Sequence, residues 1–360
     1  MLGGGGGAGN NWASGFYEHG AEASALAVER VRREAERADC LGGLLLVHSV
    51  AGGTGSGAGC AAARALRDAF PGAPLLSCAV WPFEAGEVAV QAYNALLTLD
   101  VVGEAADGIV LQRNEALARL AVQRYGIKRP ELADLNALAA QALAAVLAPG
   151  AATREPVAAR DGGVAPQLSL AEICEHLCCL PQYKLLTPAV APHVPEAARD
   201  FEQLRWPAVL KELRRAMEAR GGGLGFDGGS IGRGSGTAAR ALASAVVLHG
   251  QGADTADASE VCAPELFSCW APAGARALVA AAPLRPPPSG LAMSAAALSN
   301  SSAATAPVAG AVERAYSMYA ARAYVHQYEA HGGSAADIEA GLASAEETLA
   351  SYAALHAAVP

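Results

Sequence analysis

The first part of the chain alternates short apolar runs with longer amphipathic stretches. Residues 41–50 and 75–80 are nearly continuous apolar runs, as buried parallel strands are, and 108–111 is a shorter one. The stretches around them predict helices at 21–38, 60–69, 91–99, 114–125 and 134–147. Strands that alternate with helices favour a doubly wound α/β domain up to about residue 155.

The pattern changes after a Pro- and Gly-rich linker expected at 149–163. Helices are expected at 168–177 and 205–220, and a strand at 243–249. Residues 221–236 are Gly- and Ser-rich and predict a loop, and the Pro-, Ala- and Ser-rich residues 283–305 predict little fixed structure. The chain closes with two expected helices, 309–331 and 335–356, separated by two glycines.

The composition and net charge of the chain argue against several classes of protein. The chain has 360 residues, of which 52% are hydrophobic, so it can bury the cores of about two domains. Its formal net charge of -9 argues against a nucleic-acid binder, which needs a basic face. No window reaches about 18 strongly apolar residues, so we expect no membrane span. Met1 and Leu2 are followed by five glycines, a start unlike that of a secretory signal.

The eight cysteines are expected to be small buried thiols in a reducing compartment, because none forms a CxxC pair. Cys174, His176 and Cys178 come nearest to a zinc-binding pattern. Their spacing does not match such a site, so we expect no metal-binding residues.

A Gly-rich segment, residues 51–59, lies between an expected buried strand and an expected helix. Glycines allow a tight turn there, and the helix N-terminus and free amides suit a phosphate. No Lys-Ser or Lys-Thr follows, so it is not a Walker A loop. A Rossmann dinucleotide site would need an acid about 20 residues later, which is missing. A Gly-rich turn without a ligand remains open, since the chain holds 40 glycines.

Five ordered segments resemble nucleotide-contacting segments of the tubulin family. Gly52-Gly53-Thr54-Gly55-Ser56-Gly57 resembles the family's signature phosphate loop, with Ala51 in place of its first glycine. Residues 7–13 resemble the loop near the gamma-phosphate, and 87–94 the sugar-contacting segment. Residues 114–117 and 134–136 resemble the two guanine-contacting segments. The resemblance spans about residues 5–355, and residues 81–88, 323–328 and 349–352 resemble the delta branch of the family.

This resemblance implies an α/β fold: an incomplete tubulin-like Rossmann-type nucleotide-binding domain, an α+β intermediate domain and C-terminal helices. The expected bounds are 1–155, 156–308 and 309–360.

The resemblance also implies a GTP/GDP site, with each residue in the role of its family counterpart. Asn114 and Asn136 would read the guanine, because an amide offers both a donor and an acceptor. Leu132 stands where the family often has an aromatic residue and offers no π-face. Glu172 would be a catalytic acid that acts in trans, on the nucleotide of a neighbouring subunit; an ordinary surface glutamate is the alternative. The remaining nucleotide-binding residues are Gly9, Asn10, Gly52, Gly53, Thr54, Gly55, Ser56, Gly57, Glu87 and Gln91.

The sequence departs from the family at its start. The family's first strand, its Gly-Gln-Cys-Gly-Asn-Gln loop and the acidic loop near Mg²⁺ have no counterpart. We therefore expect an N-terminally truncated member and an incomplete gene model, with unpaired strand backbone and apolar sheet surface exposed. The family implies Mg²⁺, but its acidic loop is missing here.

Three functions follow as hypotheses. The first is a GTP-binding structural protein of the microtubule cytoskeleton, with a possible weak GTPase activity completed by a partner subunit. Its implied partners are other tubulins or microtubule and centriolar proteins. Its implied locations in the cell are the cytoplasm, centriole, basal body and cilium. The second is a GTP-free binding module for tubulin-like partners. The third is an unrelated dinucleotide enzyme, which would bind NAD.

Overall fold

The computed structural model describes residues 7–86, 88–147, 168–201, 203–219, 238–282 and 287–357. The chain divides into two compact units. The first consists of Met1–Arg113, Leu180–Lys184 and Thr305–Ser351. The second consists of Asn114–Cys179, Leu185–Ala304 and Tyr352–Pro360. Both units combine strands and helices, which confirms the α/β class.

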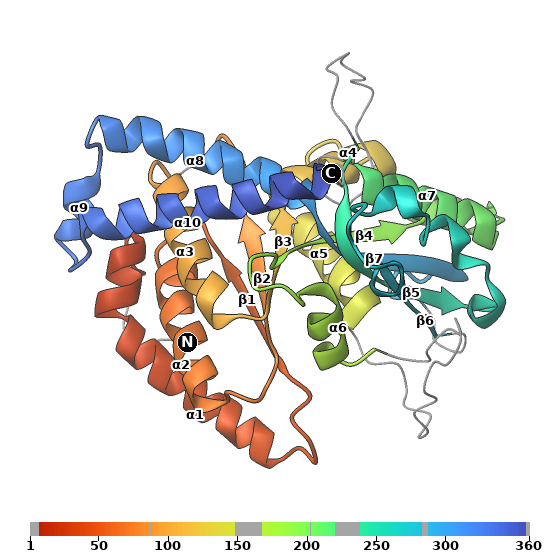
Figure 1. Ribbon diagram of the computed structural model, residues 1–360, viewed down its shortest axis with the longest axis horizontal. Coiled ribbons are helices and arrows are strands. Elements are labelled where there is room, and N and C mark those ends of the chain that lie inside the picture. Colours follow the sequence, from red (N-terminus) through yellow and green to blue (C-terminus); the bar gives the residue numbers. More distant parts are fainter. Residues whose placement is uncertain are drawn as a thin grey trace. The chain divides into compact units, whose positions relative to one another are not determined.

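Three parallel strands belong to the first unit and lie in the order β1-β2-β3. They are β1 (Leu44–Ser49), β2 (Leu75–Trp81) and β3 (Gly108–Arg113). Helix α1 (Gly20–Glu36), which precedes β1, and the connecting helices α2 (Gly59–Ala69) and α3 (Gln91–Ala105) lie side by side (Figure 1). This is the alternation that the apolar runs predicted, with α3 extending further than expected.

The edge strand β1 exposes apolar side chains. Leu45 is 45% exposed and Val47 is 58% exposed, whereas His48 on the other face is buried. Within the described residues, β2 is its partner on one side only. Apolar side chains of the sheet are therefore exposed at this strand.

Three C-terminal helices complete the first unit: α8 (Thr305–Ala320), α9 (Val325–Glu329) and α10 (Ala335–Ala353). Helix α8 packs on α3, and hydrogen bonds from Tyr316 to Glu346 and from Tyr319 to Glu339 join α8 to α10 (Figure 1). The single helix expected at 309–331 is wrong. Arg322 and Tyr324 have positive φ angles of 49° and 63°, which no continuous right-handed helix allows.

Four strands belong to the second unit and lie in the order β4-β7-β5-β6. They are β4 (Leu185–Ala191), β5 (Ala241–Gly250), β6 (Ala277–Ala282) and β7 (Met293–Ser301). Its helices are α4 (Asn114–Tyr125), α5 (Leu132–Leu147), α6 (Leu170–Leu177) and α7 (Trp206–Glu218). Short helical turns follow at Glu196–Phe201, Ala253–Thr255, Ala258–Glu260, Pro264–Leu266, Ala273–Ala275, Ser302–Ala304 and Ala354–His356.

The expectation of little fixed structure at 283–305 is wrong, because β7 is a strand that lies between β4 and β5. It pairs antiparallel with β4 and with β5, for example Ala297 with Ala189 and with Val246. Its residues from Ser294 to Ser301 are buried. Small side chains suit a strand that has neighbours on both edges and helices on both faces, and this tertiary setting overrides their low strand propensity.

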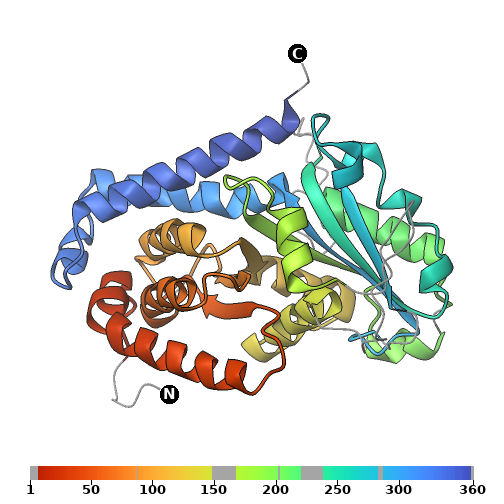
Figure 2. The ribbon, with the colours of Figure 1, turned by 60° about the horizontal axis from the view of Figure 1, so that its bottom comes forward.

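Helices cover both faces of this sheet. Leu210 and Leu213 of α7 join one core with Val246 of β5 and Ala295 of β7. Helix α5 contacts β4, β5 and β7, and Figure 2 shows it on the face opposite α7. No helix within the described residues is long and apolar enough to cross a membrane.

The cysteine prediction holds for only part of the set. Cys60, Cys78 and Cys174 are buried, and burial raises the pKa of the first two thiols to about 12. Four cysteines, however, are exposed, because they lie in connecting segments: Cys40, Cys179, Cys262 and Cys269. The predictions for 149–163 and 221–236 fall outside the described residues, and the three-domain division remains a prediction.

Candidate functional site

The Gly-rich segment forms the turn between β1 and α2. A helical turn, Thr54–Ala58, leads directly into α2. The first amides of a helix have no acceptor within the helix, and they carry the positive end of its dipole. The turn therefore offers backbone N–H groups to an anion at this end of the strand.

The carbonyl groups of this turn are held by internal donors. The Gly53 oxygen accepts from the Gly57 amide at 2.7 Å. The Gly52 oxygen accepts from the Ser56 hydroxyl, and the Gly55 oxygen lies 3.0 Å from the His48 Nδ1 atom. In a planar trans peptide the N–H points away from the C=O. The amides that follow these carbonyls are therefore directed to the opposite side.

The hydroxyl groups of Thr54 and Ser56 differ in their surroundings. Thr54 is exposed, and its oxygen accepts from the Ala8 amide at 3.3 Å, so its proton remains able to donate. Ser56 is fully buried, and its hydroxyl donates to loop carbonyl groups. The Ser56 side chain thus stabilises the turn.

A second loop, which contains Gly9 and Asn10, lies against the first. Both residues have left-handed φ angles, 53° and 57°. The loops approach through their backbones, since a Cβ atom on Gly53 would lie 2.7 Å from the Asn11 amide nitrogen. Glycine is therefore required at position 53. The two loops that the sequence analysis assigned to phosphate contacts are brought together.

Asn94 of α3 connects these loops to each other. Its Nδ2 atom donates to the carbonyl oxygens of Asn10 and Ala51, both at 2.8 Å. Its Oδ1 atom accepts from the Trp12 amide at 3.0 Å and from the Tyr328 hydroxyl at 2.6 Å. Asn94 is fully buried and uses both its donors and its acceptor, so it organises the loops rather than facing a ligand.

His48 and Ser77 lie beneath the first loop. The His48 Nε2 atom is 2.8 Å from the Ser77 hydroxyl, and both side chains are buried. Burial lowers the pKa of His48 below its usual value, so the ring is neutral at pH 7. Neither residue was predicted from the sequence. The available signal was a polar residue in each of two otherwise apolar strands.

Gln91 makes its hydrogen bonds within its own loop. Its Nε2 atom donates to the Phe83 oxygen at 2.9 Å, and the residue is 7% exposed. Gly86 packs closely on this amide. A contact from Gln91 to a sugar would need this arrangement to change. Glu87, the other sugar-contacting candidate, lies outside the described residues.

Asn114 and Asn136 belong to the second unit. Asn114 is the half-buried first residue of α4, and Asn136 is exposed on the neighbouring helix α5. Leu132 opens α5 and is 65% exposed. Their assignment to the guanine stays a prediction.

Glu172 is part of a capping box at the N-terminus of α6. Its carboxylate accepts from the Ser169 amide at 2.8 Å, and its own amide donates to the Ser169 hydroxyl at 3.2 Å. The Ser-x-x-Glu spacing is the sequence signal for this role. The carboxylate of the candidate catalytic acid therefore stabilises its own helix, and its action in trans stays a prediction.

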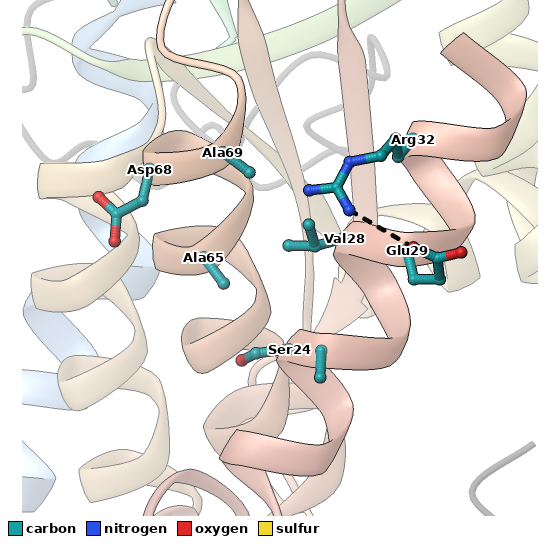
Figure 3. A pocket seen from close by; sticks show the side chains of 8 residues that line it. Ser24, Val28, Glu29, Arg32, Ala65, Asp68 and Ala69 are labelled. Atoms are coloured by element: carbon teal, nitrogen blue, oxygen red, sulfur yellow. Dashed lines mark hydrogen bonds and ion pairs between the residues drawn. The ribbon is translucent and has the colours of Figure 1, made fainter. Parts of the chain in front are cut away.

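A shallow groove between α1 and α2 is separate from these residues (Figure 3). Arg32 reaches over it and pairs with Glu29 at 3.4 Å, between partly exposed side chains. Its lining contains none of the candidate nucleotide-binding residues: Ser24, Ala25, Val28, Glu29, Arg32, Ala65, Asp68 and Ala69.

Comparisons with known proteins point to one family. Residues 1–122 match the model of the Tubulin/FtsZ family, GTPase domain. The chain is 29% identical over 370 residues to the tubulin delta chain of Macaca fascicularis, covering 96% of this chain and 78% of that one. The tubulin delta chains of Homo sapiens and Mus musculus are also 29% identical, over 368 and 367 residues. These alignments cover 96% and 97% of this chain, and 78% of each relative.

Proposed function

Because residues 1–122 match the GTPase domain of the Tubulin/FtsZ family and the chain is similar to tubulin delta chains, we propose that it is a tubulin-family, GTP-binding structural protein of the microtubule cytoskeleton. The finer part of the proposal is a role in the assembly of centrioles, basal bodies and cilia. It rests on the similarity to the delta branch.

The geometry of the two loops in the first unit carries the proposal of nucleotide binding. The Thr54–Ala58 turn directs amides away from its internally bonded carbonyl groups, and Gly53 lets the loop of Gly9 and Asn10 approach. No Asp or Glu occurs in residues 8–13 or 51–59, so a phosphate meets no carboxylate there. The same absence means that these loops supply no carboxylate to Mg²⁺, and we assign no magnesium ligand to them.

The remaining contacts are proposals from the resemblance. Asn114 and Asn136 would bind the guanine edge, and Glu87 and Gln91 the sugar. Glu172 would act on the nucleotide of a neighbouring subunit, so hydrolysis would require assembly with another tubulin. The proposed location is the cytoskeleton, at centrioles, basal bodies or cilia.

Titration of the 360-residue chain with labelled GTP, with ATP as competitor, tests the proposal. We expect saturable binding that GTP competes for and ATP does not. Asn114→Ala and Asn136→Ala should each weaken binding about tenfold, the effect of one lost hydrogen bond to a base. Gln123→Ala, an exposed position on α4, is the matched control and should bind normally.

A second candidate is a GTP-free binding module for tubulin-like partners. The internal hydrogen bonds of Gln91 and the lack of an aromatic ring at Leu132 favour it. Absence of GTP binding, together with retained binding to a tubulin, would support this function and contradict the first.

A further inference from the structure

The short helix α9 links α8 to α10 in the first unit (Figure 1). It has only five residues, and Tyr324 before it has a left-handed φ angle of 63°. A helix of this length is not stable by itself in water, and a tyrosine in this backbone conformation is strained. The position of α9 therefore depends on its contacts with neighbouring segments.

Two of these contacts lead to the candidate phosphate loops. The Gln327 carbonyl oxygen accepts from the Asn11 Nδ2 atom at 3.1 Å. The Tyr328 hydroxyl donates to the Asn94 Oδ1 atom at 2.6 Å, and its ring packs edge-to-face on the ring of Tyr93. Asn11, Asn94 and Tyr328 are all buried, so water cannot replace these contacts while the fold is closed.

Asn11 belongs to the loop that contains Gly9 and Asn10. Its amide donates to the Ala8 oxygen at 2.9 Å, and its Oδ1 atom accepts from the Ala13 amide at 2.8 Å. One asparagine therefore shapes the loop with its amide and its Oδ1 atom, and binds α9 with its Nδ2 atom. Displacement of α9 would leave this buried Nδ2 donor without the Gln327 acceptor.

Asn94 connects α9 to both loops through one rigid group. Its Oδ1 atom receives the Tyr328 hydroxyl, while its Nδ2 atom holds the carbonyl oxygens of Asn10 and Ala51. A side-chain amide is planar, so Oδ1 and Nδ2 rotate together. Opening of α9 and loosening of the two loops therefore break the same set of hydrogen bonds.

We propose that α9 responds to the nucleotide: occupation of the phosphate loops stabilises α9 through Asn11 and Asn94. This inference rests on the proposed binding of GTP to these loops. A ligand that orders the loops disfavours states in which the two asparagines have lost α9, and such states bind the ligand more weakly. Local opening of α9 is therefore rarer when the nucleotide is bound.

Amide hydrogen exchange of the 360-residue chain, measured with and without saturating GTP, tests the proposal. GTP should slow exchange at residues 325–331 about fivefold or more, the usual lower bound for coupled sites. Helix α8 is the internal comparison, because it packs on α3 and its Tyr316 hydroxyl bonds to Glu346 of α10. Exchange in α8 should change by less than about twofold, since its opening releases neither asparagine.

Tyr328→Phe removes the hydroxyl that reaches Asn94 and keeps the ring. GTP should still bind, and the slowing at residues 325–331 should shrink to about twofold or less, because only the Asn11 bond remains. Tyr352→Phe is the matched control. It removes an equally buried hydroxyl, which donates to Asn300 at 2.6 Å in the second unit, and should keep the full slowing.

GTP binding without slowing at residues 325–331, or with equal slowing in α8 and α9, would overturn the inference and leave the proposed function intact. Equal slowing in Tyr328→Phe and in the unmodified chain would also overturn it. Absence of saturable GTP binding would contradict the proposed function, and the inference with it. If Tyr328→Phe does not fold, the comparison of α8 with α9 in the unmodified chain decides.

Discussion

The Tyr328 hydroxyl donates a 2.6 Å hydrogen bond to the Oδ1 atom of Asn94, and both residues are buried. Through Asn94 this bond links α9 to the loops of Asn10 and Ala51. The C-terminal helices of the first unit and its candidate phosphate loops therefore share one hydrogen-bond network.

Asn94→Asp should lower the free energy of unfolding by about 3 kcal/mol or more at pH 7, because it places a carboxylate oxygen against two carbonyl oxygens. The substitution preserves shape and the acceptor for Tyr328. Protonation of the new carboxyl restores one donor, so part of the loss should be recovered as the pH falls. Urea denaturation at pH 7 and pH 5 measures both effects.

Tyr328→Phe is the matched control for this network. It removes one donor, while Asn94 Oδ1 keeps the Trp12 amide, so the loss should be about 1 kcal/mol. Equal losses for the two variants would contradict the role assigned to the Asn94 amide.

At Glu172 the contribution of the carboxylate charge can be measured separately from the contribution of the capping box to stability. Glu172→Gln keeps a capping-box residue, so stability should change by less than about 0.5 kcal/mol. Glu172→Ala removes the box and should cost about 1 kcal/mol. Thermal unfolding of the two variants measures the difference.

Hydrolysis in co-assembly with a tubulin tests the proposed action in trans. Loss of GTP turnover by Glu172→Gln, with assembly retained, would support a catalytic carboxylate. Unchanged turnover would leave Glu172 with its capping role alone.

His193 makes the second unit sensitive to acid. The residue is buried, its Nε2 atom has no hydrogen-bond partner among the described residues, and burial lowers its pKa from 6.5 to about 4. The unfolded state therefore binds a proton between pH 6.5 and 4 while the folded state does not. Stability should be full above about pH 6.5 and fall toward pH 4, by about 3 kcal/mol from this group.

His193→Phe should flatten this acid limb, measured as the urea midpoint from pH 4 to pH 7. His48, whose pKa is also lowered by burial, will keep part of the slope. His326→Phe, at an exposed position on α9, is the control and should leave the slope unchanged. A slope that persists fully in His193→Phe would contradict the assignment.

The exposed Val47 side chain on the edge strand β1 should favour association of the chain with further copies of itself. Val47→Lys should reduce aggregation of the chain, because a charge on an exposed strand edge opposes pairing with another strand. Stability should change by less than about 0.5 kcal/mol, since the side chain is 58% exposed. Light scattering against concentration measures the effect, and Val122→Lys on α4 is the helical control. Equal improvement in both variants would indicate a general effect of charge.

The sequence pattern predicted a helix or strand correctly where the residues of that element alone show which side is buried. The apolar runs predicted β1, β2 and β3, and α4 begins and ends at the predicted residues, because a buried strand or an amphipathic helix shows its burial in its own periodicity. The glycines between β1 and α2 predicted a turn that an anion could approach, because only glycine tolerates such close backbone contacts.

Tertiary structure decided the features that depend on distant neighbours. Ala- and Ser-rich β7 is a central strand because β4 and β5 pair with its two edges, which its own composition does not show. Arg322 and Tyr324 break a helix whose periodicity continues through them. The sequence by itself determined the resemblance to a family, the α/β class and the place of the Gly-rich turn. The roles of Asn94, His48 and Glu172 required the folded chain, because a hydrogen bond depends on which partner lies within about 3 Å.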